Sequence, residues 1–562
     1  MLLHTSYFFD MIVLHSVTRR LGFLAAALLV GLMLGAPGAL AQNGEKYGGR
    51  LNYAERETVN EFNPYQRQEP RPAPDRLYTL IYETLVSYDY DREKVMPSLA
   101  TDWSVSPQNA QAPEQITFEL REDVRWHDGE RFTAEDVAFT YRYVVEFQAA
   151  TNEGAIKRFG GLIDSVRTDP SANTVTFDLV RPTPKPAQRF SSFWIIPEHK
   201  FNEKYVPKDE TESLSRKPVG TGPYRFVELL MNGNVTLAAY KDYWGDGPFI
   251  AETEMRRSLD PSTMATEAIA GNLRLIVRTP LEQVGRLEQS GDFALRSYQS
   301  LSFNAFGYNS NHPILGLQVV RRALTRAVDR TSLLKEWYAD KGRVIGGPLV
   351  PGHPYYNPDV QPREHDPERA RKLLSAAGYE DRDGDGVRET VDGNELRFQL
   401  LTLKPKAAGS TRRQNVAQSY ASQLEKVGVK IEVVSRVFSE YQELKKRGEY
   451  EIAWVRWEFD PTYDITSLFL SEETGAGGDN FVNYNNQKVD KLIRSFREAK
   501  DPEAKRSYIY RIQEIIHEDV PYTFLYTVEN YAAINLFVIP SRIDPYYFFS
   551  YYKSWYINPG VR

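Results

Sequence analysis

Residues 116–137 read ITFELREDVRWHDGERFTAEDV and contain three successive structural signals. In 116–120 apolar and polar side chains alternate, which predicts a strand with one buried face. His127-Asp128-Gly129 has the residue types of a tight turn. Thr133 is a typical helix N-cap residue, and Asp136 adds a carboxylate in the first turn, where the helix dipole favours it. The stretch therefore predicts a strand, a turn and a capped helix.

Helices and strands alternate elsewhere in the chain. Asp366-Pro367 predicts a helix start, because Pro suits the first helical position, and Gly378 predicts the end of that helix. The pattern of 414–427 predicts a helix, and that of 429–434 predicts a strand after the helix-stopping Gly428. No period of 20–50 residues repeats, so the sequence predicts an α/β architecture rather than a solenoid.

The composition is that of a globular protein. Of 562 residues, 41% are hydrophobic and 13% aromatic. Single cores rarely exceed roughly 250–300 residues, so this length predicts several lobes. The formal net charge of −6 argues against nucleic acid as a partner. The absence of cysteine excludes disulfides, thiolate catalysis, Cys-ligated metals and a lipid anchor on an N-terminal Cys.

The N-terminal segment has the features of a secretory signal peptide. Arg19 and Arg20 precede an apolar run at 21–36, and Ala39-Leu40-Ala41 is a small-x-small cleavage site. The alternative is an N-terminal membrane anchor, but the run is short for a spanning helix of ~20 residues. We expect residues 1–41 to be removed, and the remaining protein to be periplasmic and not a lipoprotein.

Further motifs lie before and after residues 116–137, in a fixed order. They are Asp102-Trp103-Ser104, 217–224 (KPVGTGPY), 242–245 (DYWG), Phe303-Asn304, 320–324 (VRRAL), 327–330 (AVDR) and 376–379 (AAGY). Together they resemble the extracellular solute-binding proteins of family 5, the peptide- and nickel-type receptors of ATP-driven importers. The resemblance extends from about residue 48 to the C-terminus.

The resemblance implies a bilobal periplasmic-binding-protein fold of type II, in which two mixed-sheet α/β lobes enclose a hinge cleft. An extra domain packs on the N-terminal lobe in the peptide-binding members. The implied division is 48–92, 214–306 and 531–562 for lobe I, 93–213 for the extra domain and 307–530 for lobe II.

The implied function is that of a receptor without catalytic activity. It would capture an oligopeptide or an oligosaccharide and deliver it to the permease and ATPase subunits of the importer. The resemblance implies a monomer that requires no cofactor.

The segment 452–464, IAWVRWEFDPTYD, is the most informative about the ligand. In peptide receptors of this family, the equivalent segment has a Trp, an Asp three residues later that pairs with the α-ammonium of the peptide, and then Asp-Pro. Alignment on Asp460-Pro461 puts Trp457 at the position of that Asp, and Glu458 is one residue out of register. This departure predicts ligands without a free ammonium, such as oligosaccharides or N-blocked peptides.

Residues two apart share a face of a strand. Trp454 and Arg456 should therefore point one way, and Trp457 the other. Because an unpaired buried Arg is costly, we expect Trp454 and Arg456 to line the cleft; the alternative is that both tryptophans fill the core of lobe II. The complete set of ligand-binding candidates is Trp454, Arg456, Trp457, Glu458, Asp460, Glu55, Arg56, Tyr308 and Asn309.

The stretch 381–392, DRDGDGVRETVD, has the oxygen spacing of a calcium loop. The candidate ligands are Asp381, Asp383, Asp385, Val387 through its carbonyl, Glu389 and Asp392. An acidic, Gly-rich turn is the alternative. A bound calcium ion would be structural rather than part of transport.

A second class of function is a secreted hydrolase, since aromatic residues beside carboxylates also occur in glycosidase clefts. No Gly-x-Ser-x-Gly or His-Glu-x-x-His sequence is present, and the ordered receptor motifs favour the receptor.

Overall fold

The computed structural model describes residues 46–66, 72–89, 92, 94–106, 114–147, 162–180, 183, 185–258, 260–300, 302–405, 411–459, 465–475, 478–499, 501–544 and 548–558. The chain divides into two compact units, Met1–Lys46 and Tyr47–Arg562. The predicted signal peptide, 1–41, lies outside the described residues.

A 12-stranded sheet of mixed direction organises the second unit. Its strands are β1 (Arg50–Glu55), β8 (Tyr224–Leu229), β9 (Val235–Ala239), β10 (Glu252–Arg257), β11 (Leu275–Ile276), β12 (Phe293–Gln299), β13 (Ser302–Tyr308), β14 (Gly342–Val344), β15 (Arg397–Leu403), β16 (Lys430–Arg436), β17 (Ile452–Glu458) and β18 (Tyr522–Asn535). Pairs β1–β10, β1–β11, β15–β16 and β15–β17 are parallel, and the other pairs are antiparallel. The predicted α/β class with mixed sheets is confirmed.

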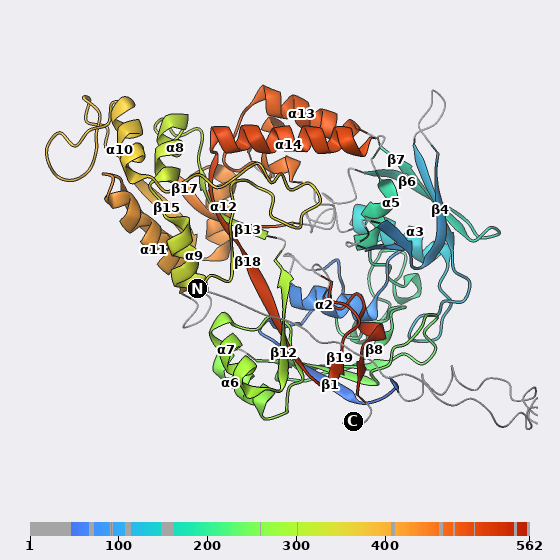
Figure 1. Cartoon of the computed structure of the whole chain (residues 1–562). Helices are drawn as coiled ribbons and strands as arrows, with labels where there is room; N and C mark the ends of the chain where they lie inside the picture. Colours follow the sequence, from blue (N-terminus) through green and yellow to red (C-terminus); the bar gives the residue numbers. More distant parts are fainter. Residues whose placement is uncertain are drawn as a thin grey trace, which may run out of the picture. The chain divides into compact units, whose positions relative to one another are not determined.

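Strand β18 belongs to both parts of this sheet (Figure 1). Its first half pairs with β13, where Asn304 lies opposite Tyr526, and its second half pairs with β12, where Phe293 lies opposite Asn535. We call the part with β1 and β8–β12 the first lobe and the part with β13–β17 the second lobe. The Oγ1 of Thr527 in β18 donates to the carbonyl of Ser300, 3.1 Å away, and ties together the two segments that cross between the lobes.

A separate four-stranded antiparallel sheet lies within the range predicted for the extra domain, 93–213. Its order is β4 (Ala100–Ser106), β5 (Gln115–Leu120), β7 (Thr174–Leu179) and β6 (Ile163–Asp169). Its apolar residues belong to the same core as those of β1, β9 and β10. The remaining strands form two antiparallel two-stranded sheets, β2 (Val86–Asp89) with β3 (Lys94–Pro97) and β19 (Val538–Ile539) with β20 (Tyr556–Ile557). The predicted domain boundaries stay predictions.

Residues 116–137 have the predicted structure. Strand β5 is followed by a turn and by α3 (Ala134–Arg142), and Asp136 accepts the N–H of Thr133 at 2.9 Å. His127 fixes the turn, because its Nε2 lies 2.9 Å from the carbonyl of Gly222 and its Nδ1 accepts the N–H of Gly220. Burial lowers the pKa of His127 to about 4.

Helices cover the sheets. The longer ones are α2 (Pro72–Ile81), α6 (Pro261–Ile269), α7 (Leu281–Ser290), α8 (Gln318–Arg326), α9 (Arg330–Tyr338), α10 (Pro367–Ala376), α11 (Arg412–Glu425), α12 (Phe438–Arg447), α13 (Gln487–Glu498) and α14 (Pro502–Asp519). The predicted Asp-Pro start of α10 is confirmed, since Asp366 accepts the N–H of Arg369 at 2.8 Å and Gly378 follows the helix with φ +88°. The predicted helix at 414–427 is α11, and the predicted strand at 429–434 is β16.

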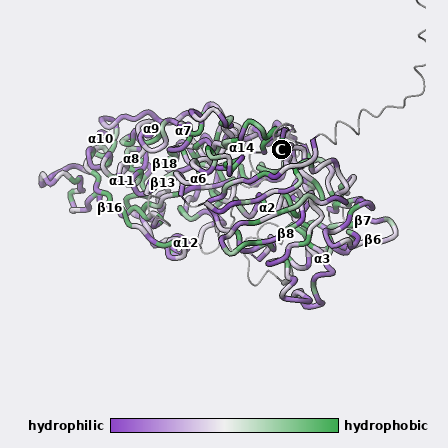
Figure 2. The backbone as a smooth tube through the Cα atoms, turned by 90° about the horizontal axis from the view of Figure 1, so that it is seen from below, coloured by the Kyte–Doolittle hydropathy of each residue, from purple (hydrophilic) through white to green (hydrophobic). Residues whose placement is uncertain are grey.

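In the second lobe, β13 is buried on both faces. Phe306 and Tyr308 belong to a core formed with α8, α9 and α11, which we call the helix-side core. Phe303 and Ala305 face the opposite core, formed with α13 and α14. Short hydrophobic and hydrophilic segments alternate along the chain in Figure 2, and among the described residues no helix combines the length and the apolar character needed to cross a membrane.

Candidate functional site

Strand β17 carries the tryptophans and charges singled out in the sequence. Trp454 belongs to the helix-side core, whereas Val455 and Trp457 pack against the opposite core. The predicted alternation along this strand is therefore present. Arg456 and Glu458 share the face of Trp454, but they lie nearer the end of the strand and are exposed.

Trp454 does not line a surface, and the prediction for this residue needs correction. It is only 3% exposed, and its ring meets Phe306 edge-on with centroids 5.4 Å apart. Tyr420 of α11 packs on Phe306 within the same core. The alternative reading, in which the tryptophan fills the core, holds for Trp454. Trp457 is only partly buried.

Arg456 and Glu458 form an ion pair at the end of β17. The Nη2 of Arg456 lies 2.5 Å from the Oε1 of Glu458, and the two side chains are 36% and 47% exposed. The Nη2 of Arg278, which follows β11 in the first lobe, lies 3.9 Å from the same oxygen. The positive charge of Arg456 lowers the pKa of Glu458. Partial desolvation of the carboxylate acts in the opposite direction, and the charge of Arg278 lowers the pKa further. Glu458 is thus an ionised carboxylate shared between two arginines of different lobes.

A second ion pair lies nearby at the end of β1. The Nη2 of Arg76 in α2 is 2.5 Å from the Oε1 of Glu55, and both side chains are about 5% exposed. Desolvation raises the pKa of Glu55, and Arg76 opposes this effect. Arg278 also acts electrostatically on Glu55, and Arg76 on Glu458. We call Glu55, Arg76, Arg278, Arg456 and Glu458 the charged cluster.

The other sequence candidates have different positions. Tyr308 is fully buried and its hydroxyl lies 2.6 Å from that of Thr523, so it is a core residue because β13 is covered on both faces. Asn309 is buried and donates to the carbonyls of Gly448 and Tyr450, which fixes a turn. These two residues are corrected from ligand-binding to structural. Arg56 is exposed after β1, and Asp460 lies outside the described residues.

Four arginines near this site were not found by sequence reasoning. Arg76 and Arg278 reach it from separate elements, and no local pattern brings them together. Arg412 and Arg413 are the first two residues of α11. Acidic residues are usual at a helix start, so two basic residues there were a sequence signal of an unusual site. Arg412 pairs with Glu282 of α7 in the first lobe at 3.3 Å.

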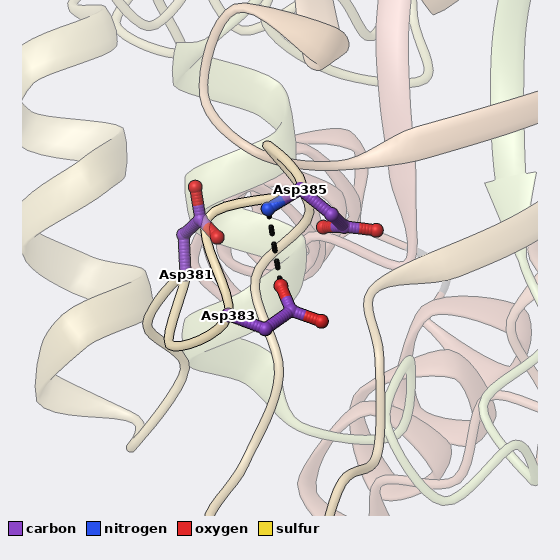
Figure 3. A group of neighbouring side chains, drawn as sticks. All are labelled: Asp381, Asp383 and Asp385. Carbon is purple, nitrogen blue, oxygen red and sulfur yellow. Dashed lines mark hydrogen bonds between the residues drawn. The ribbon is translucent and has the colours of Figure 1, made fainter.

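The acidic loop brings three of the six predicted calcium ligands together (Figure 3). One carboxylate oxygen from each of Asp381, Asp383 and Asp385 lies within 4.8 Å of the others. The loop's own N–H groups already bond to these side chains, as in the 3.1 Å bond from Asp385 N to Asp383 Oδ1, and Arg397 pairs with Asp385 at 2.8 Å.

The remaining carboxylates of the predicted set are not part of this group. Glu389 accepts the N–H of Arg382 at 2.7 Å, and Asp392 does not join the three aspartates. Val387 donates its N–H to Asp385. Calcium binding stays a prediction.

Comparison with known proteins gives a consistent result. The family described as bacterial extracellular solute-binding proteins, family 5 Middle, matches residues 94–478, more than half of the chain. Protein XP55 of Streptomyces lividans is 29% identical over 537 residues, which are 94% of this chain and 92% of that protein. The dipeptide-binding protein of Escherichia coli (strain K12) is 26% identical over 460 residues, 78% of this chain and 82% of that protein.

Solved structures share the fold. The crystal structure of NikA from Brucella suis in complex with Fe(III)-EDTA matches with a TM-score of 0.79. The match covers 91% of this chain and 100% of NikA, at 22% identity.

Proposed function

Because the chain belongs to the bacterial extracellular solute-binding proteins of family 5, we propose that it captures peptides and delivers them to an ATP-driven importer. Members of this family are substrate-binding receptors. The proposal of a peptide, rather than an oligosaccharide, rests on the E. coli relative, which is named for dipeptide binding. The hydrolase alternative has no support from these matches.

The peptide would bind at the charged cluster. The observation that carries this proposal is the exposed Arg456–Glu458 pair, which meets Arg278 of the first lobe. Charged side chains at the junction of two lobes can bond to the amide and charged groups of a peptide, and ligand contacts to both sides favour closure of the lobes. The buried Glu55–Arg76 pair would support this surface from the first lobe.

The binding partner of the peptide ammonium needs a new proposal. The family spacing of a Trp followed three residues later by Asp occurs at Trp457 and Asp460, although in this register no Asp-Pro follows the Asp. Since Trp454 is a core residue, we favour the second register, with Asp460 as the ammonium partner. Glu458 is a weaker candidate, because Arg456 and Arg278 already compensate its charge. This proposal replaces the expectation of ligands without a free ammonium.

We further propose export to the periplasm with cleavage after Ala41, action as a monomer, and no chemical change of the ligand. Intact-mass analysis of the exported protein tests the first point. A mass that retains residues 21–41 would contradict it.

Calorimetric titration of the refolded, ligand-free protein tests the main proposal. We expect trialanine to bind and to be recovered intact, and maltotriose not to bind. The Arg456→Gln variant should bind trialanine more weakly than Arg447→Gln, a control on the surface of the second lobe whose partner is Glu449. Binding of maltotriose alone, or cleavage of the peptide, would contradict the proposal.

A further inference from the structure

Met231 lies at the tip of the hairpin that joins β8 to β9. Its side chain is fully exposed, and the neighbouring Leu229 and Leu230 are 39% and 40% exposed. Methionine is an apolar residue that usually fills gaps in a core or packs against other side chains. The sulfur of Met231 is therefore unusually accessible to small solutes.

The other methionines of the described residues are protected. Met255 in β10 and Met264 in α6 are 0% and 1% exposed, and Met96 in β3 is partly buried. A solute reaches a buried thioether only when the surrounding structure opens, and this opening costs free energy. Met231 thus differs from these three methionines in access rather than in chemistry.

Backbone hydrogen bonds fix the turn that carries Met231. The N–H of Leu230 donates to the carbonyl of Asn234, and the N–H of Gly233 donates to that of Leu230, each at 2.8 Å. Gly233 has a φ of +87°, a conformation that glycine adopts without strain. None of these bonds involves the side chain of Met231, so a chemical change of that side chain leaves the turn intact.

The tip is also separate from the charged cluster. Strand β8 is at the edge of the large sheet, and the order β1-β10-β9-β8 puts two strands between it and β1, which ends at Glu55. A change at Met231 therefore leaves the residues of the charged cluster untouched.

We infer that Met231 is a reversible oxidation site, modified by peroxide oxidants ahead of the other described methionines and without loss of the fold. The sulfur attacks one oxygen of hydrogen peroxide, so that an S–O bond forms, the O–O bond breaks and the peroxide is reduced to water. The product, methionine sulfoxide, is polar, and it converts the apolar tip into a polar one. Methionine sulfoxide reductases reverse the step, since a dithiol takes up the oxygen as water and becomes a disulfide.

Peptide mapping after brief exposure of the folded protein to hydrogen peroxide tests the inference. Trypsin cleaves after Arg225 and Lys241, so Met231 is the only methionine in the fragment 226–241. We expect this fragment to gain about 16 Da at least about tenfold faster than the fragments with Met255 and Met264, because local structure protects those two residues. Treatment with both methionine sulfoxide reductases and dithiothreitol should remove the added mass.

Two variants assign the modification and its effects. In Met231→Leu the fragment 226–241 should gain no mass, and in the control Met96→Leu the oxidation of Met231 should be unchanged. The melting temperature of the unaltered protein should be the same before and after oxidation of Met231. Equal or faster oxidation of Met255 or Met264 would overturn the inference. A lower melting temperature after oxidation, absent from peroxide-treated Met231→Leu, would also overturn it.

Discussion

Arg278 and Glu458 approach each other within 3.9 Å from different lobes, and Arg456 contacts the same carboxylate oxygen at 2.5 Å. Glu458 lies opposite Ser302, two residues after Ser300, where the chain crosses between the lobes beside Thr527. A rotation of the lobes about these crossings would change the distance between Arg278 and Glu458. Ligand binding and lobe closure can therefore act on the same charges.

The Glu458→Gln variant should lose only a little stability. The side chain is half exposed, and exposed ion pairs contribute about 0–1 kcal/mol. Because the pKa of Glu458 is lowered in the folded protein, its contribution is present above the pKa of the unfolded chain and is lost as the pH falls through the folded value. Urea denaturation should show a larger difference from the unaltered protein at pH 7 than at pH 3. A difference that grew at pH 3 would contradict this account.

His127 should make stability depend on pH in a higher range. Its pKa is about 4 in the folded protein and about 6.5 when unfolded, so the unfolded chain binds more protons between these values. Stability should therefore fall as the pH is lowered from 6.5 towards 4. This part of the pH dependence should be smaller in His127→Gln and unchanged in the control His365→Gln. An identical pH profile in all three proteins would argue against a neutral His127.

Trp454 should matter for folding rather than for ligand contact. Trp454→Ala should cost about 3–5 kcal/mol in the free energy of unfolding, because it empties a large core site. Trp454→Phe should cost less, since it keeps an aromatic ring against Phe306 and removes an indole N–H that has no partner among the described residues. Trp454→Phe should bind peptide with unchanged affinity. A folded Trp454→Phe protein with at least tenfold weaker binding would restore Trp454 to the site.

Asp460 and Glu458 can be separated as partners of the peptide ammonium. We expect Asp460→Asn to weaken the binding of trialanine by tenfold or more. It should also remove the preference for trialanine over its N-acetyl form. Glu458→Gln should retain this preference. The opposite pattern, with the preference lost only in Glu458→Gln, would favour the original alignment on Asp460-Pro461.

Calcium should raise the melting temperature if the acidic loop binds it. Three carboxylates within 4.8 Å repel one another, and a divalent cation would relieve this repulsion. The increase should disappear in Asp383→Asn and persist in the control Asp359→Asn. Equal melting temperatures of the unaltered protein in calcium and in chelator would rule the site out.

Local patterns predicted local structure well in this chain. The strand and capped helix around His127 and the Asp366 helix start depend on neighbours within a few residues, so sequence reasoning found them. The alternation along β17 was also predictable, because it follows from the strand period. The sequence did not predict which end of β17 is exposed. Trp454 is covered by Phe306 and by α11, and both are remote from it in the sequence.

The charged cluster also depends on contacts between residues that are remote in the sequence. Glu55 was a candidate from its place after the first strand, but its burial against Arg76 depends on how α2 packs on that strand. Arg278 reaches the site only through the pairing of β11 with β18. Charge partners that come from distant segments carry no local signal.

Mass spectrometry of the small molecules released from the exported protein tests the central claim most directly. The protein is isolated in its closed, ligand-bound form, denatured, and the released compounds are separated from the chain. We predict that the released compounds are peptides. Release of oligosaccharides or metal chelates without peptides would contradict the account.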